Sequence, residues 1–135
     1  MVEKTLAIIK PDAVQAKKSG KIIERIEQEG FNILAIKKIH LTREQAEQFY
    51  GVHKGKHFFD VLVDFTSSGP LIAMVLEKEN AIQAWRNLMG ATNPANAEEG
   101  TLRKLYGTAG ERNATHGSDA PETAEKEIKF FFPEL

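Results

Sequence analysis

The sequence predicts an α+β protein in which helices pack on one sheet of four antiparallel strands. Three observations predict this class: a length that suits one domain, short β-rich apolar runs, and helix-period stripes between those runs. The chain has 135 residues, of which 41% are hydrophobic and 27% are charged. A chain of this size buries roughly two-thirds of its unfolded surface. We therefore expect residues 1–135 to form a single domain.

The first part of the chain predicts a strand, a helix and a second strand. The apolar run Thr5–Lys10, which Pro11-Asp12 ends, is typical of a central strand. Isoleucines at helical spacing before Gly30 predict a helix over about 20–29. Residues 31–41 alternate loosely between apolar and polar side chains and predict a long strand. A shift in the phase of that alternation indicates a β-bulge.

Two helices, a strand and a further helix are predicted next. The segment Thr42–Gln45 matches a capping box and predicts a short helix that reaches Tyr50. A second helix is predicted by apolar residues at i, i+3, i+4 and i+7, which are Phe58, Val61, Leu62 and Phe65. Residues 71–76 are typical of a buried strand, and Asn80 is expected to cap a helix that Gly90 ends.

The last third of the chain begins with a stretch, Ala91–Asp119, that has no periodic pattern. A loop of this length in a compact domain is usually functional or disordered, and its scattered Arg, Asn, His and Ser favour function. Pro121 then opens a short helix, and Ile128–Phe132 is predicted as the final strand. The order of elements is that of a ferredoxin-like α/β sandwich (βαββαβ) with additional helices and a long functional loop. Periodicity alone leaves a small doubly wound sheet open as an alternative.

Composition excludes several classes of protein. The chain has no cysteine, which rules out disulfides, Cys-ligated zinc and thiol nucleophiles. Its net charge of −1 argues against non-specific binding of polyanions. No apolar run approaches the roughly 18 residues of a membrane span, and the N-terminus has no signal peptide. We therefore expect a cytoplasmic protein that does not bind membranes.

The sequence has no glycine-rich phosphate loop. Residues 51–57 resemble one, but three residues rather than four separate the two glycines, and no Ser or Thr follows the lysine. The glycine fingerprint of dinucleotide-binding folds is also missing from the sequence. Any nucleotide site must therefore be built from side chains.

His116 has a different context from the other histidines, because it lies inside the long loop with Gly117 directly after it. A glycine there permits a close approach of other groups to the backbone. Ser118 and Asp119 are near enough in sequence to offer hydrogen bonds. A catalytic role and a loop-stabilising role are both open from the residues alone. A Ser-His-Asp triad is disfavoured, because triads are assembled from distant segments.

The segment Asn113-x-x-His116-Gly117-Ser118-Asp119 resembles the active-site signature of nucleoside diphosphate kinases. Further segments resemble that family in the same order along the chain: 9–14, 58–59, 68–70, 88–94 and 100–103. The resemblance covers nearly the whole chain and implies the ferredoxin-like fold. It also implies that the γ-phosphate of a nucleoside triphosphate such as ATP is moved to another nucleoside diphosphate by a ping-pong mechanism.

The resemblance implies that His116 is the nucleophile and becomes a phosphohistidine. A neutral imidazole nitrogen attacks without a separate base, which suits this role. Glu127 matches the family's glutamate that orients the ring, and Ser118 matches a serine that steadies the pair. Tyr50 matches a tyrosine near the histidine.

The resemblance also implies the nucleotide contacts. The matching phosphate and sugar contacts are Lys10, Arg86, Thr92, Arg103 and Asn113, and cations among them suit the charge of a transferring phosphoryl group. The matching base contacts are Phe58, on which the base rests, and Leu62. Mg²⁺ is expected as cofactor, held mainly by substrate and water, with Asp119 reaching it through water.

The family's assemblies imply a homo-oligomer, either a hexamer or a tetramer. Lys56-His57 departs from the family's usual Arg-Pro before the phenylalanine, which concerns the base site. A binding module on the same fold is disfavoured, because the segment Phe130–Phe132 has no strongly basic flanks; no specific nucleic acid partner is expected. A hydrolase that uses Ser118 has no further support in the sequence.

Overall fold

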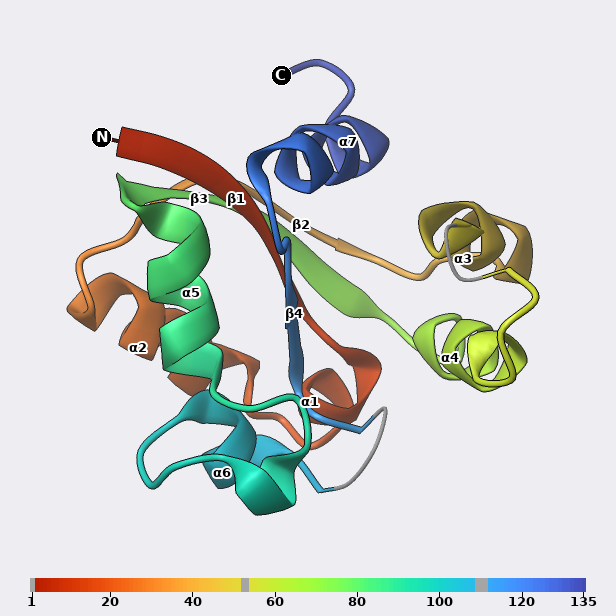
Figure 1. The fold of residues 1–135 in the computed structure, drawn as a ribbon, viewed down its shortest axis with the longest axis horizontal. Helices are drawn as coiled ribbons and strands as arrows, with labels where there is room; N and C mark the ends of the chain where they lie inside the picture. Colours follow the sequence, from red (N-terminus) through yellow and green to blue (C-terminus); the bar gives the residue numbers. More distant parts are fainter. Residues whose placement is uncertain (1, 52–53, 109–111) are drawn as a thin grey trace.

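The computed structural model describes residues 2–51, 54–108 and 112–135, so part of the rejected 51–57 segment lies outside the described residues. No helix in these ranges has the length and apolar character needed to span a bilayer. Strands and helices alternate along the chain (Figure 1), with these bounds: β1 (Val2–Ile9), α1 (Pro11–Gln15), α2 (Ser19–Gln28), β2 (Asn32–Ile39), α3 (Arg43–Phe49), α4 (Phe59–Thr66), β3 (Leu71–Glu79), α5 (Ala81–Met89), η2 (Pro94–Asn96), α6 (Leu102–Tyr106), β4 (Thr115–Gly117) and α7 (Pro121–Phe131).

The sheet has four strands in the order β2-β3-β1-β4, and every neighbouring pair is antiparallel. This arrangement confirms the predicted ferredoxin-like sandwich, and the doubly wound alternative, whose strands are parallel, is wrong. The first strand is central, as predicted, because β1 pairs with both β3 and β4. The predicted bulge is present as a register shift between Ile33 and Ala35.

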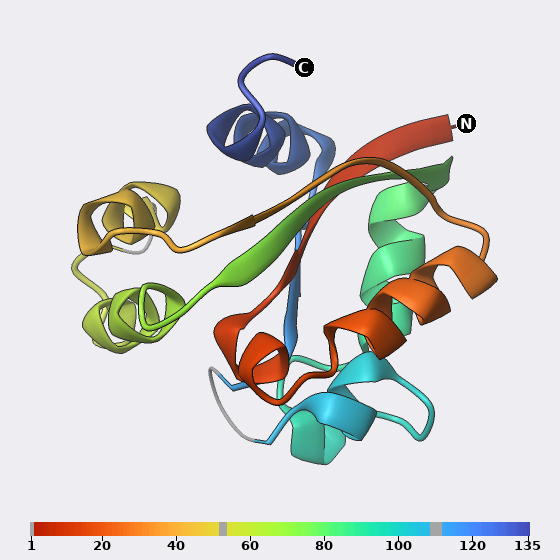
Figure 2. The same ribbon diagram turned by 180° about the vertical axis from the view of Figure 1, so that it is seen from behind.

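Helices cover both faces of this sheet (Figures 1 and 2). Leu6 and Ile8 of β1 pack in a core with residues of α3, α4 and α7. Ala7 and Ile9, which point to the other face, pack in a second core with residues of α2 and α5. Because both faces are buried along 6–9 of β1 and 71–76 of β3, these parts of the central strands are apolar without alternation, which explains their continuous apolar runs in the sequence.

The helices of the first half follow the predicted signals, with one change in α4. In the capping box, the Thr42 hydroxyl accepts from Gln45 N–H at 3.1 Å and the Gln45 side chain accepts from Thr42 N–H at 2.9 Å. In α4, however, Phe58 is 39% exposed and Val61 is 51% exposed. Of the predicted stripe, Phe65 is buried and Leu62 packs against the core, whereas the rest of the buried face is formed by Phe59 and Val63.

The final strand predicted at Ile128–Phe132 is wrong, because Ile128–Phe131 belong to α7. Ala124, Ile128 and Phe131 lie at i, i+4 and i+7, so a helix brings them to one face, which packs against the sheet. The fourth strand is instead β4, within the stretch predicted as a loop. A strand of three residues is too short to show a periodic pattern.

Other local signals act differently from the prediction. Pro11 opens α1 rather than only ending β1, since a proline at the first helical position sacrifices no hydrogen bond. Thr101 caps α6 within the predicted loop. Asn80 precedes α5 with a φ of 52° and makes no side-chain cap, and Glu3 accepts from Ile82 N–H at 2.9 Å.

Candidate active site

Strand β4 carries His116 on the sheet, where it pairs with Ile8 of β1. The backbone is fixed from behind, because the Trp85 indole N–H donates to the His116 carbonyl at 3.1 Å. A Cβ at Gly117 would clash with the same indole ring. The glycine after the histidine therefore permits the close packing that the sequence suggests at this position.

The imidazole of His116 is held by a carboxylate from α7. His116 Nε2 lies 3.1 Å from Glu127 Oε1, and the Ser118 hydroxyl donates to the same oxygen at 2.9 Å. Both ring and carboxylate are partly buried, with 22% and 15% of the side chains exposed. Since an ionised carboxylate only accepts hydrogen bonds, this contact favours the tautomer with the proton on Nε2. The Nδ1 lone pair is then available to a substrate.

Two aromatic rings lie beside the imidazole, that of Phe49 at the end of α3 and that of Tyr50, the next residue. Phe49 meets it edge-on at a centroid distance of 5.4 Å, and Tyr50 at 6.4 Å. Burial raises the pKa of Tyr50 to about 12, and the negative charge of Glu127 acts in the same direction. The Tyr50 hydroxyl therefore keeps its proton at physiological pH.

Arg103 of α6 is a buried cation that two carbonyl groups hold in place. Its guanidinium donates to the Gly90 carbonyl at 3.2 Å and to the Thr115 carbonyl at 2.9 Å, next to His116. Burial, together with the like charge of Arg86, lowers the pKa of Arg103 to about 10. Arg103 still stays charged near neutral pH. Its positive charge on α6 therefore repels that of Arg86 on α5.

Lys10 reaches the same region from the end of β1. It is 6% exposed, and its ammonium donates to the Asn113 side chain at 3.0 Å. The Asn113 amide in turn donates to the Thr92 carbonyl at 3.0 Å. This chain of hydrogen bonds connects three predicted phosphate and sugar contacts that are far apart in the sequence.

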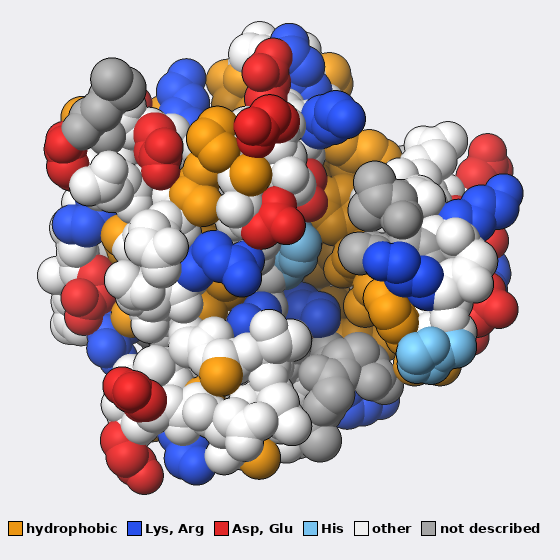
Figure 3. Space-filling model, in the orientation of Figure 1, with side chains coloured by type: hydrophobic (Ala, Val, Ile, Leu, Met, Phe, Trp, Pro, Cys, Tyr) orange, Lys and Arg blue, Asp and Glu red, His pale blue; other side chains and the backbone are white. Residues whose placement is uncertain are grey.

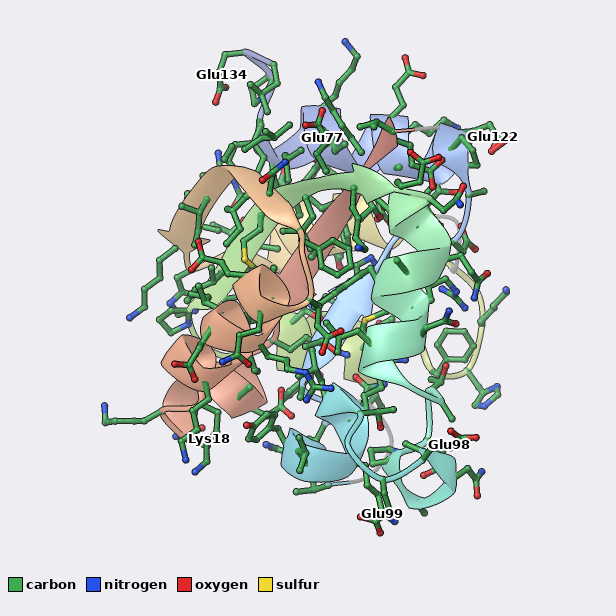
Figure 4. All side chains as sticks on the ribbon, turned by 90° about the vertical axis from the view of Figure 1, so that its left-hand side faces the viewer. Lys18, Glu77, Glu98, Glu99, Glu122 and Glu134 are labelled. Atoms are coloured by element: carbon green, nitrogen blue, oxygen red, sulfur yellow. The ribbon has the colours of Figure 1, made fainter. Side chains whose placement is uncertain are left out.

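Arg86, Thr92 and Arg103 line one cavity of about 530 Å³, together with Gly90, Asn96 and Glu98. Figure 4 shows Glu98 and its neighbour Glu99 at the end of the molecule that η2 and α6 form. Lys10 and Asn113 do not line this cavity and reach it through Thr92. The structure therefore brings the predicted phosphate and sugar contacts into one region. Three of them line the cavity, and the other two are connected to it by hydrogen bonds.

Phe58 and Leu62 lie elsewhere, at the start and in the first turns of α4. Helix α4 and helix α5 stand on opposite sides of β4 (Figures 1 and 2). In the space-filling view, basic side chains and a histidine border a hollow between the α3–α4 pair and the rest of the molecule (Figure 3). His57 contacts Phe58 edge-on at 5.6 Å, and Lys56 lies over the same ring at 5.8 Å from its centroid.

Asp119, the predicted contact to Mg²⁺ through water, is exposed directly after the buried Ser118. The described part of the chain has no group of three or more His, Asp or Glu side chains that would hold a metal by themselves.

Two features of the site were not predicted from the sequence. The carbonyls of Gly90 and Thr115 fix Arg103, and Asp12 accepts a hydrogen bond from Ala114 N–H at 3.0 Å. The residue types do not indicate which main-chain carbonyl groups accept a hydrogen bond, because every residue has one. The rival hydrolase is disfavoured, because the Ser118 side chain is buried and donates to Glu127.

Comparisons with known proteins find relatives along nearly the whole chain. The family model described as nucleoside diphosphate kinase matches residues 3–135. A protein of Persephonella marina with the same description is 59% identical over 134 residues, which cover 99% of this chain and 96% of that protein. One from Trichlorobacter lovleyi is 61% identical over 131 residues, with 97% and 95% covered.

Solved structures extend the likeness to the fold. The nucleoside diphosphate kinase of Aquifex aeolicus superposes with a TM-score of 0.96 at 46% identity, covering 98% of this chain and 96% of that one. The enzyme from Encephalitozoon cuniculi gives 0.92 at 39% identity, with 96% and 88% covered. A family match along nearly the whole chain, close relatives and a shared fold lead to one conclusion. The chain belongs to the nucleoside diphosphate kinase family.

Proposed function

We propose that His116 carries the phosphoryl group in the nucleoside diphosphate kinase reaction, the activity that this family membership assigns to the chain. The observation that carries the proposal is the contact of His116 Nε2 with Glu127 at 3.1 Å. Among the described residues Glu127 is the ring's hydrogen-bond partner, and Ser118 donates to the same carboxylate oxygen. The ring is thus oriented through one nitrogen and nucleophilic through the other.

In the first half-reaction the Nδ1 lone pair attacks the γ-phosphorus of a nucleoside triphosphate. An N–P bond forms, the bond from phosphorus to the β–γ bridging oxygen breaks, and the nucleoside diphosphate leaves with that oxygen. The proton on Nε2 stays in place, shared with Glu127. In the second half-reaction a β-phosphate oxygen of another diphosphate attacks the phosphorus and the N–P bond breaks, which restores the free ring.

Lys10, Arg86 and Arg103 would stabilise the charge on the transferring group. The mutual repulsion of Arg86 and Arg103 supports this role, since a bound phosphate relieves it. Thr92 and Asn113, which are joined to Lys10 by hydrogen bonds, would contact phosphate and sugar. Tyr50, whose pKa of about 12 keeps it neutral, would offer a hydroxyl beside the ring.

Phe58 and Leu62 would hold the base. The exposed ring of Phe58, with 39% of its surface accessible, supports this role because a core phenylalanine would be covered. Stacking on an aromatic face does not read the edge of a base, so purines and pyrimidines would both be accepted. This property suits an enzyme that exchanges phosphate among many nucleotides.

Mg²⁺ would enter with the nucleotide, and Asp119 would reach it through water. The scarcity of clustered carboxylates in the described residues fits an ion held by phosphate oxygens rather than by a protein cage. The ion supplies neutralising charge at the phosphate oxygens when it is bound. The chain's own cations act on the same oxygens.

The active protein would be a homo-oligomer, a tetramer or a hexamer, of a chain that forms one domain. Strand β2 supports this, because it lies at the edge of the sheet and exposes Leu34 and Ile36 by 45% and 49%. Exposed apolar edge strands favour pairing with another chain. A monomer in sedimentation equilibrium would contradict it. The cytoplasmic location stays a prediction from the sequence.

The nucleophile is tested by incubating the protein with ATP labelled on the γ-phosphate and removing the nucleotide. We expect an acid-labile, base-stable phosphoprotein that passes its label to added GDP. His116→Ala should abolish the label while ADP affinity stays within about threefold. The matched control is His40→Ala, because His40 is exposed and bonds Ser67 at 2.8 Å, outside the site. Labelling that survives in His116→Ala would sink the proposal.

A further inference from the structure

Two residues before His116, the backbone adopts a turn that disfavours side chains. Ala114 has a φ of 70°, and the Thr115 N–H donates to the Asn113 carbonyl at 2.8 Å. A bond from residue i+2 back to residue i with a positive φ at its centre defines a rare and strained form of the γ-turn. A residue with a Cβ pays energy for this conformation, whereas glycine does not.

Both backbone polar groups of this strained residue are held by the start of α1. The Ala114 N–H donates to Asp12 Oδ2 at 3.0 Å, and its carbonyl accepts from Lys10 N–H at 2.8 Å. Ala114 itself is fully buried, so no water replaces either partner. The carbonyl bond continues the pairing of β1 with β4, but the bond to Asp12 comes from a side chain.

We propose that Asp12 is a positioning residue for the phosphoryl-transfer reaction, which acts by locking the turn at Ala114 that aims His116. The turn decides where β4 begins, because Thr115, the next residue, is the first to pair with β1. If the turn relaxed toward an ordinary φ, the chain would enter β4 with a different direction. His116 would then lose its alignment with Glu127, which sits on a separate element, α7.

The local geometry of α1 explains why an aspartate suits this place. Pro11 is the first residue of the helix and Asp12 the second, so the carboxylate starts from a rigid point with a fixed φ before it. The aspartate side chain is short and has few rotamers, so few of its conformations break the hydrogen bond to Ala114 N–H. The acidic charge also lies in the first turn of a helix, where it is favourable.

The inference rests on the proposed role of His116 and is tested by the rate at which ATP phosphorylates the protein in a single turnover. Asp12→Ala should lower that rate about 10-fold or more, since small misplacements of a nucleophile cost this much. ADP affinity should stay within about threefold, because Asp12 is not proposed to touch the nucleotide. An unlabelled wild-type protein would refute the proposed function instead, so the two failures are distinguishable.

The strain predicts a specific coupling that a general loss of stability would not give. When Asp12→Ala is made in an Ala114→Gly background, it should cost no more than about twofold, because glycine holds the turn without help. An equal cost in both backgrounds would overturn the inference. Asp12→Asn keeps an acceptor oxygen and the shape, so its rate should stay within about threefold. A tenfold loss in this conservative variant would also overturn it.

Glu122→Ala supplies the matched control. Glu122 follows Pro121 at the second position of α7, as Asp12 follows Pro11 in α1. It is exposed, and α7 lies at the opposite end of the molecule from α1 (Figures 1 and 4). Its removal tests the loss of a helix N-terminal charge alone and should leave the phosphorylation rate unchanged. A loss equal to that of Asp12→Ala would show a general helix effect and refute the positioning role.

Discussion

The side chains beside His116 and those on α4 are held in different ways. Arg103, Asn113 and Ser118 are each at most 9% exposed and are fixed by hydrogen bonds to backbone or side-chain groups. At α4, Phe58, which precedes the helix, and Val61 are 39% and 51% exposed, and Phe58 is bordered by the ring of His57 and the ammonium of Lys56. The region beside His116 is polar and held by hydrogen bonds, and we call it the rigid region. The region at α4 is an exposed apolar surface.

This difference corresponds to two demands on the reaction. Transfer of a phosphoryl group requires charges that are already in place, because reorganising them during the reaction would raise the barrier. A base that varies from one substrate to the next requires a surface without directional contacts. We therefore expect substitutions in the rigid region to reduce the rate of chemistry, and substitutions on α4 to weaken binding.

The largest effect that sharpens this contrast is expected from Arg103→Ala. It removes a buried charge and leaves the carbonyls of Gly90 and Thr115 without their donor. We expect kcat/KM to fall about 10²–10³-fold, the usual cost of one such electrostatic contact. The free energy of unfolding should also fall by about 1–3 kcal/mol, the cost of unsatisfied buried acceptors. Steady-state kinetics and urea unfolding measure the two quantities.

Arg86→Ala separates these two consequences. Arg86 is exposed on α5, so its loss should change the free energy of unfolding by at most about 0.5 kcal/mol. It lines the same cavity as Arg103, and kcat/KM should still fall by about 10-fold or more. If Arg103→Ala and Arg86→Ala lowered the free energy of unfolding equally, the structural role assigned to Arg103 alone would be wrong.

A smaller effect is expected from Phe58→Ala on the open side. Loss of one stacked base contact costs about 1–3 kcal/mol, so KM should rise by roughly 5- to 150-fold. The rate of His116 phosphorylation at saturating ATP should stay within about threefold, because stacking acts equally on substrate and transition state. Val61→Ala is the control, since Val61 is on the same helix and more exposed. A fall in kcat with unchanged KM would place Phe58 in the chemical step and break the contrast.

The fold could be predicted largely because its central strands are apolar on both faces. The capping box at Thr42–Gln45 and the bulge in β2 were also readable, since each is a local signal. Strand β4 was not, because three residues give no period and its pairing depends on β1, more than 100 residues earlier. Phe131 and Phe132 misled the prediction, since their β-forming character is outweighed by packing on the sheet through α7.

The candidate site was identified through the family resemblance rather than through periodicity. Arg86 on its own resembles any solvated helix charge, and nothing in the sequence separates it from Arg103. Burial separates them, and the burial of Arg103 depends on how α6 packs against α5 and η2. The contact of Asp12 with Ala114 was also invisible, because a positive φ at an alanine has no signature in residue type.

The packing of Tyr50 beside His116 leads to a last prediction, which concerns the change of stability with pH and no change in the phosphoryl-transfer rate. Burial, reinforced by Glu127, raises the pKa of Tyr50 from 10 to about 12. Below pH 10 both folded and unfolded states hold the proton, so the contribution to stability is complete. Between pH 10 and 12 the unfolded state releases it first, and stability falls as pH rises. Two pKa units correspond to about 2–3 kcal/mol.

Tyr50→Phe isolates this contribution, because the lysines that titrate in the same range are common to both proteins and cancel in the difference. The difference in unfolding free energy between wild type and variant, measured in urea at pH 9 and at pH 11.5, should shift by about 2 kcal/mol against the wild type. The chain has two tyrosines, so Tyr106→Phe is the matched control and should leave the pH dependence in place. If the shift instead appeared with Tyr106→Phe, the Tyr50 hydroxyl would be accessible to water rather than buried. The region that is held in place around His116 would then not extend to the residue after α3.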